Sequence, residues 1–154
     1  MTSLVAMLFR IILSTILGGL IGVEREMHGH EAGLRTHILV CVGSCLIMLT
    51  SMHIFDIYKE IAHKTDPSRI AAGVVTGIGF IGAGAIIRYG MSVKGLTTAA
   101  SLWITSAVGL AIGCGYYDAG LFATVISLIT LLFLRRYGKD LIFGKNIKQN
   151  KEVK

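Results

Sequence analysis

Acidic and basic side chains are concentrated in the segment IGVEREMHGHEAGLRTH, residues 21–37, which lies between two long apolar runs. Carboxylate and guanidinium groups can form ion pairs, and Glu31 and Arg35 are four residues apart, as pairing on one helical face requires. We interpret this segment as a polar cluster at the inner face of a membrane protein, consisting of Glu24, Arg25, Glu31, Arg35 and Thr36. Two interpretations remain open: a solvated loop with interfacial anchors, or a charged vestibule at the mouth of a helix bundle.

A second group of ionisable residues consists of Arg10, Asp66 and Arg69. Arg10 lies six residues into the first apolar run, about 9 Å along a helix, and a charge inside a membrane is a candidate functional residue. Asp66 precedes Pro67, and the pair is typical of a helix start at which the carboxylate accepts backbone N–H groups. We expect both arginines toward the outer face, where Asp66 could serve either one.

The sequence favours neither catalysis nor a defined metal centre. It contains no Ser–His–Asp arrangement, phosphate-binding loop or pair of acids within an apolar run. His28 and His30 supply two imidazoles without a third ligand, so the residues that would bind a metal are unknown. The three cysteines, Cys41, Cys45 and Cys114, lack CxxC spacing and are interpreted as small buried hydrophobic residues. We expect no enzymatic activity and no cofactor.

The composition places the chain among membrane proteins. Of its 154 residues, 53% are hydrophobic and only 16% are charged, whereas about a quarter are charged in soluble domains. The net charge of +6 comes largely from the last twenty residues: Arg135, Arg136, Lys139, Lys145, Lys148, Lys151 and Lys154. A basic tail after an apolar run is typical of the cytoplasmic side of a membrane, so we expect no nucleic-acid partner.

Five apolar segments must position these residues. The predicted spans are residues 4–22, 36–54, 70–87, 96–113 and 119–134, close to the length of about 20 residues that a bilayer requires. The expected fold is therefore an all-α bundle of five transmembrane helices in residues 1–136, followed by a basic cytoplasmic tail, residues 137–154. The distribution of lysine and arginine predicts an outer N-terminus and a cytoplasmic C-terminus.

The third predicted span is unusually rich in glycine, with Gly73, Gly77, Gly79, Gly82 and Gly84. Gly73 and Gly77 form a GxxxG pair, which lets another helix approach closely within a membrane. The five glycines are thus predicted to pack helices. A pore-lining or breakable helix is the alternative, since glycine-interrupted spans mark transporter sites.

Four ordered blocks, RIILSTILGGLIGVERE, AGLRTHILVCVGSCLIML, DPSRIAAGVVTGIGFIGAGAIIR and VKGLTTAASLWITSAVGLAIGCGYY, resemble the MgtC/SapB family of bacterial inner-membrane proteins. The resemblance covers residues 10 to about 136 and implies a five-helix membrane domain. By position, the family's polar and glycine signature falls on Arg10, Glu24, Arg25, Arg35, Thr36, Asp66, Arg69, Gly77, Gly79, Gly82 and Gly84. Longer members carry a soluble C-terminal ACT-type domain, so this chain is expected to be a short form, nearer the SapB branch.

The resemblance implies a role in growth under magnesium limitation and, in pathogens, in survival inside macrophages. It also implies contact with a membrane partner such as the F-type ATP synthase. We therefore expect a multi-pass inner-membrane regulator that acts by packing against a membrane protein or a second copy of itself. The alternative is a transporter or channel for magnesium or another cation, although no cluster of intramembrane acids is visible in the sequence.

Overall fold

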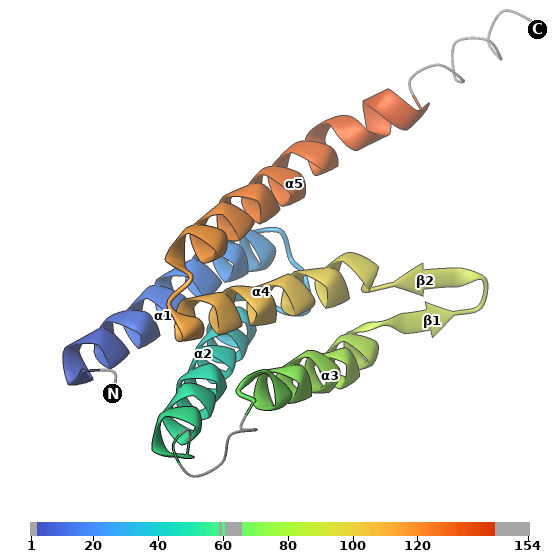
Figure 1. The fold of residues 1–154 in the computed structure, drawn as a ribbon. Helices are drawn as coiled ribbons and strands as arrows, with labels where there is room; N and C mark the ends of the chain where they lie inside the picture. Colours follow the sequence, from blue (N-terminus) through green and yellow to red (C-terminus); the bar gives the residue numbers. More distant parts are fainter. Residues whose placement is uncertain (1–2, 59, 61–65, 144–154) are drawn as a thin grey trace, which may run out of the picture.

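Five helices and one short hairpin make up the computed structural model, which describes residues 3–58, 60 and 66–143 (Figure 1). The helices are α1 (Leu4–Met27), α2 (Leu34–Tyr58), α3 (Ser68–Ala85), α4 (Leu96–Cys114) and α5 (Tyr117–Phe143). Two strands, β1 (Ile87–Tyr89) and β2 (Ser92–Lys94), pair antiparallel between α3 and α4.

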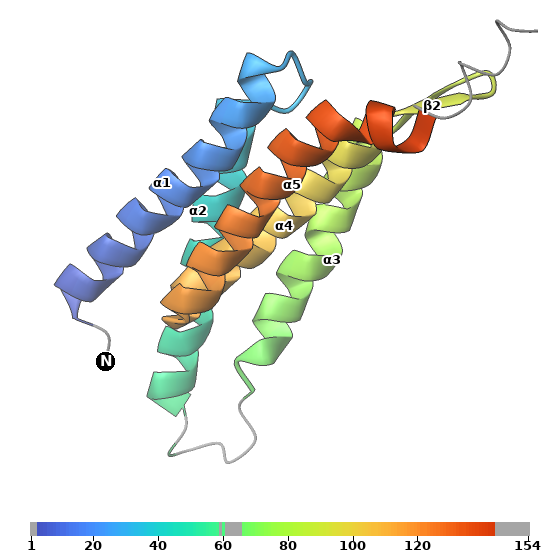
Figure 2. The ribbon, with the colours of Figure 1, turned by 90° about the horizontal axis from the view of Figure 1, so that it is seen from above.

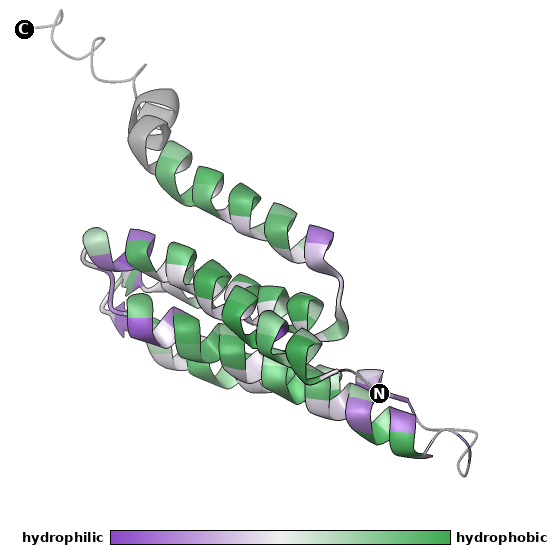
Figure 3. Ribbon diagram, turned by 90° about the vertical axis from the view of Figure 1, so that its left-hand side faces the viewer, coloured by the Kyte–Doolittle hydropathy of each residue, from purple (hydrophilic) through white to green (hydrophobic). Residues whose placement is uncertain are grey.

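The predicted all-α membrane fold is confirmed, because each expected span coincides with a helix. Four helices, α1 to α4, are long and apolar enough to cross a bilayer, and α5 contributes a shorter apolar stretch, Tyr117–Phe133. In Figure 3 the helices are hydrophobic along most of their length and hydrophilic near their ends. α5 continues through Phe143, past the predicted domain boundary at residue 136, and residues 144–154 of the predicted tail lie outside the described residues.

The connection between α3 and α4 differs from the prediction. The third span was expected to reach residue 87, but α3 ends at Ala85 and a hairpin follows. Gly90, with a φ of +59°, occupies the first of the two turn positions between the paired residues Tyr89 and Ser92. A two-residue hairpin turn of type II′ requires a positive φ at that position, which glycine adopts without strain.

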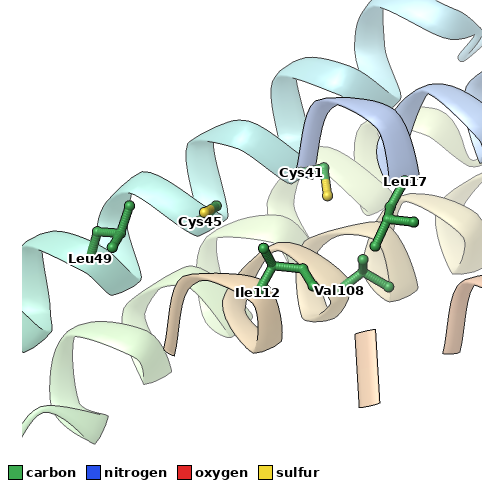
Figure 4. Close-up of a cluster of buried hydrophobic side chains, with 6 residues drawn as sticks. All are labelled: Leu17, Cys41, Cys45, Leu49, Val108 and Ile112. Atoms are coloured by element: carbon green, nitrogen blue, oxygen red, sulfur yellow. The ribbon is translucent and has the colours of Figure 1, made fainter. Parts of the chain in front are cut away.

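The core lies between α1, α2 and α4 (Figure 4). Its buried cluster contains Leu17, Cys41, Cys45, Leu49, Val108 and Ile112. Cys41 and Cys45 are free thiols within this cluster, so their prediction as small buried hydrophobic residues is confirmed, whereas that of Cys114 is wrong. Cys114 is exposed because it is the last residue of α4, where the core ends.

Two GxxxG pairs bring the core helices together. A Cβ added to Gly18 would lie 2.6 Å from the Cβ of Cys41, and one added to Gly22 would lie 2.7 Å from the Cα of Leu34. The pair on α4, Gly109 and Gly113, meets α2 in the same way, at 2.8 Å from the Cβ of Ser44 and 2.7 Å from that of Met48. Glycine at these four positions is therefore what permits α2 to contact both α1 and α4 closely.

α3 and α5 lie at the periphery of this core. α3 runs beside α4 (Figure 2), and its buried residues are only Ile78 and Gly82. α5 is held at its beginning by Gly120, which lies against Ile112, and by the buried Thr124. Beyond that point it stands apart from the other helices (Figure 3). Two helices of the chain thus present most of their surface outward.

Candidate functional site

At the end of α1, Glu24 and Arg25 form a buried ion pair. Their exposed fractions are 6% and 2%, and Arg25 Nε donates a hydrogen bond to Glu24 Oε2. His28 Nδ1 lies 3.0 Å from Glu24 Oε1 and 2.7 Å from the backbone oxygen of Glu24. A carbonyl oxygen only accepts, so Nδ1 donates its proton to the backbone oxygen of Glu24. Oε1 has no hydrogen-bond partner among the described residues. The first half of the polar cluster is therefore part of the packed bundle.

The second half of the predicted cluster does not join this pair. Glu31 and Arg35 are both exposed, and no ion pair connects them in the described part of the chain. Thr36 is half-buried in the first turn of α2. The segment 28–33 is a short turn and not a helix, so the spacing that would place Glu31 beside Arg35 on one face is absent.

A neighbouring acid performs a role that was not predicted. Glu26 Oε2 accepts a hydrogen bond of 2.7 Å from the backbone N–H of Leu34, the first residue of α2. A Cβ on Gly33 would lie 2.7 Å from the same oxygen, so a side chain there would displace this carboxylate. Helix N-termini leave backbone N–H groups free, and a carboxylate satisfies them. Glu26 therefore fixes the turn between α1 and α2.

The buried His37 extends the polar contacts from α2 to α4, and sequence reasoning did not select it. Its Nδ1 lies 2.8 Å from the oxygen of Gly33 and its Nε2 lies 3.1 Å from Ser101 Oγ. Ser101 Oγ is also 2.8 Å from the oxygen of Thr98, to which it donates. The available signal was the four-residue spacing that places His37 and Cys41 on one helical face, but that spacing is equally typical of an apolar core.

At the opposite end of the bundle, Arg10 binds the connection between α4 and α5. Its Nε donates to Tyr117 Oη at 3.0 Å and its Nη1 donates to the oxygen of Gly113 at 2.8 Å. The guanidinium carbon also lies 5.8 Å from the centre of the Tyr117 ring. A partly buried arginine is thus satisfied by a hydroxyl, a helix C-terminal carbonyl and an aromatic face. Asp66 is not among its partners.

Asp66 and Arg69 belong instead to the start of α3. Asp66 Oδ1 accepts a hydrogen bond of 2.8 Å from the backbone N–H of Ser68. The side-chain hydroxyl and the backbone N–H of Ser68 together hold the pKa of this exposed carboxyl below its usual value. Arg69 is exposed, and its backbone N–H donates to the oxygen of Asp66 at 3.3 Å. Pro67 takes the N-cap position, one residue before the first helical turn where it was expected. The three residues expected near the outer face thus serve two separate structural sites.

The glycines predicted to pack helices behave differently from the pairs in α1 and α4. A Cβ added to Gly73, Gly77, Gly79 or Gly84 would have no described neighbour within 4 Å. Only Gly82 faces another helix, with Ala99 Cβ at 3.6 Å. Four of the five positions therefore contact no helix among the described residues, because α3 turns its other side to α4.

A groove of about 510 Å³ runs along this open side of α3, between α3 and α2. Leu39, Gly43 and Ile47 line it from α2, and Gly73 and Gly77 line it from α3. At its floor the hydroxyls of Ser44 and Ser106 are hydrogen-bonded to each other at 3.0 Å, so they present little free polarity. The groove is therefore apolar, and glycines, which have no side chain, leave the space for it.

The described residues contain no group of three or more His, Cys, Asp or Glu side chains that could hold a metal ion. The polar residues of these sites instead connect helices through hydrogen bonds. These bonds join α1 to the α1–α2 turn, α2 to α4, and α1 to the α4–α5 turn. The open glycine side of α3 is the candidate functional surface, because no element of the described chain covers it.

Comparison with known proteins relates this chain to a protein family. The family model described as the MgtC family matches residues 11–139. The chain is 49% identical over 125 residues to the putative magnesium transporter YhiD of Escherichia coli K12, covering 80% of this chain and 58% of that protein. It is 41% identical over 128 residues to protein MgtC of Salmonella typhimurium LT2, covering 83% of this chain and 52% of that protein.

An uncharacterised protein of Haemophilus influenzae is 35% identical over 125 residues, covering 79% of this chain and 52% of that protein. The chain therefore spans about half the length of the curated relatives it matches. No solved structure matches it significantly. The apolar helices and the extent of the family match lead to one conclusion: this chain is a multi-pass protein of the bacterial inner membrane and belongs to the MgtC family.

Proposed function

We propose that this protein is a non-enzymatic regulator that supports adaptation to magnesium limitation by packing the open side of α3 against a transmembrane helix of another protein. The names of its relatives, MgtC and putative magnesium transporter YhiD, support the link to magnesium. The F-type ATP synthase is the partner that the family resemblance suggests, and survival inside macrophages would be a consequence in a pathogen. In the proposed topology, the N-terminus lies on the outer side of the inner membrane and the C-terminus lies in the cytoplasm.

The observation that carries the proposal is the uncovered glycine side of α3. At about 100° per residue, Gly73, Gly77 and Gly84 lie within about 40° of one another around the helix. Each has no described neighbour within 4 Å of an added Cβ, although Phe80, beside them, is 85% exposed. Together with the adjacent groove, they leave room for the backbone of an incoming helix.

This chain already uses the same spacing to pack helices. The pairs Gly18–Gly22 and Gly109–Gly113 each receive a neighbouring helix so closely that an added Cβ would lie within 2.8 Å of it. Gly73 and Gly77 have the same separation, and their helix is long enough to span the membrane. Contacts of this kind drive helix association in lipid, where burial from water contributes nothing.

The test compares Gly77→Leu with Gly79→Leu. Both glycines lie on α3 without a described neighbour, but Gly79 lies about 160° from Gly77 around the helix, on the opposite flank from the groove. We expect affinity purification from magnesium-starved membranes to recover the partner with wild type and Gly79→Leu, and to lose it with Gly77→Leu. Equal insertion of both variants in the membrane is the control, and equal recovery of the partner would refute the proposal.

Transport of magnesium or another cation is a second candidate. The buried Glu24, with one carboxylate oxygen that has no hydrogen bond among the described residues, is the observation that favours it. A transporter would give magnesium flux into proteoliposomes that contain the purified protein alone, and Glu24→Gln would abolish it while Glu31→Gln would not. Regulation by helix packing predicts no flux in that sample, so the two candidates are separated by one measurement.

A further inference from the structure

The β1–β2 hairpin is left uncovered by the bundle. Every residue from Ile86 to Lys94 is exposed, with Tyr89 at 84% and Met91 at 99%. Figures 1 and 2 show the hairpin projecting beyond the ends of α3 and α4. An isolated pair of three-residue strands is marginal in water, so this element needs support from its surroundings.

The base of the hairpin is fixed to the two helices. Gly95, which follows β2, has a φ of +86°, and a Cβ there would collide with the backbone oxygen of Ala85 at the end of α3. The two strands therefore leave α3 and enter α4 at nearly the same place. The direction in which the hairpin projects follows from those helices, which hold its base.

The charges of the hairpin have no counterpart in this part of the chain. No Asp or Glu occurs between Asp66 and Asp118, whereas the hairpin carries Arg88 and Lys94. Arg88 Nε donates only to the backbone oxygen of Gly90, at 3.2 Å, and neither basic side chain forms an ion pair with a described residue. An anionic surface would therefore complement this hairpin.

The register places the two basic side chains on opposite faces of the ribbon. Cross-strand partners share a face, and the pairs are Ile87 with Lys94, and Arg88 with Val93. A partner that docked on one flat face would leave the other charge unsatisfied. Anionic groups that surround the hairpin would satisfy both, and a layer of lipid headgroups has that property.

The depth of the hairpin agrees with such a layer. α3 has 18 residues and is about 27 Å long, close to the hydrocarbon thickness of about 30 Å. Its end therefore lies near the boundary between acyl chains and headgroups. Strands of three residues extend about 10 Å further, across a headgroup region of about 5–8 Å on each side. Tyrosines are enriched at this level of membrane proteins, as Tyr89 would be here.

We propose that the β1–β2 hairpin is an anchor in the headgroup layer that binds anionic phospholipid, with phosphates on Arg88 and Lys94 and with Tyr89 and Met91 among the headgroups. This surface is separate from the open side of α3, and its lipid contact holds whether or not α3 binds a partner protein. Each basic residue near an anionic bilayer shifts the equilibrium toward the bound state by about fivefold.

The experiment measures how fast an uncharged maleimide labels Met91→Cys in nanodiscs. The background is Cys114→Ser, since Cys114 is exposed whereas Cys41 and Cys45 are buried. We expect labelling to be at least about tenfold slower in nanodiscs with phosphatidylglycerol than in nanodiscs of phosphatidylcholine alone. Glu31→Cys, in the exposed α1–α2 turn, is the matched control and should change little between the two lipids.

The charge dependence completes the test. The double variant Arg88→Gln and Lys94→Gln should remove the difference in labelling rate between the two lipids. The double variant Arg88→Lys and Lys94→Arg should keep that difference, and added salt should weaken it. Slow labelling in both lipids would indicate cover by a protein or a second copy and would overturn the proposal. So would equally fast labelling in both lipids, or a lipid difference that persists without the two charges.

Discussion

Replacing Gly109 with alanine tests the packing of α2 against α4 most directly. The added methyl would lie 2.8 Å from Ser44 Cβ and 3.0 Å from the carbonyl carbon of Cys41, and it would collide with the Cys41 oxygen. Backbone atoms cannot rotate away, so the two helices must separate. Overpacking of this kind costs about 1–3 kcal/mol, and the backbone contact places this variant at the upper end. The helix propensity of alanine offsets up to about 1 kcal/mol of that cost.

Gly77→Ala is the matched control. It makes the same chemical change on an apolar helix, but its Cβ would have no described neighbour within 4 Å. It should leave the free energy of unfolding unchanged or raise it by up to about 1 kcal/mol. Unfolding in mixed micelles with increasing denaturing detergent, followed by circular dichroism, should therefore separate the two variants by about 2–3 kcal/mol. Equal stability of the two variants would refute the assignment of Gly109 to a close helix contact.

Three further predictions concern the polar contacts. Glu24→Gln leaves the guanidinium of Arg25 buried without its carboxylate, and the free energy of unfolding should fall by about 3–5 kcal/mol in the same assay. Tyr117→Phe removes the hydroxyl that binds Arg10, and a loss of about 1.5–3 kcal/mol is expected, with no loss if that bond is absent. The pKa of Asp66 is lower in the folded state, so this carboxylate stabilises the fold above its unfolded pKa. Its contribution to the free energy of unfolding disappears as the pH falls through the folded pKa. Asp66→Asn should therefore flatten the decline in stability at acid pH, measured in a pH series of unfolding experiments.

Hydropathy predicted the helices because a membrane requires every backbone polar group to bond within its own segment, and only long apolar helices do so. The hairpin was missed for a related reason. Ile86 and Ile87 continue the apolar run of α3, and three-residue strands give too short a pattern to separate from it. The positive φ of Gly90 becomes evident only from the coordinates.

The apolar spans of the sequence also contain three GxxxG pairs, Gly18–Gly22, Gly73–Gly77 and Gly109–Gly113, and their spacing alone cannot say which face a neighbouring helix. The pair chosen from the sequence, in the most glycine-rich span, is the one that the fold leaves open. The burial of Glu24 and Arg25 could not be predicted either. Their burial depends on how far α1 continues past its apolar run, and a sequence pattern places helix ends only to within one or two residues. Hydropathy also does not show whether two charged side chains form an ion pair.

The close contact between α2 and α4 has a consequence for biogenesis, because these helices are not consecutive in the chain. When α2 leaves the ribosome, the helix that fits against it has not been made, and α3 must enter the bilayer first. The backbone oxygens of Cys41 and Cys45, which lie against Gly109 and Gly113 in the finished bundle, therefore face lipid or a chaperone during that interval. Insertion of α4 is then the step at which the helices can pack into the bundle, and α3, inserted earlier, remains at its periphery.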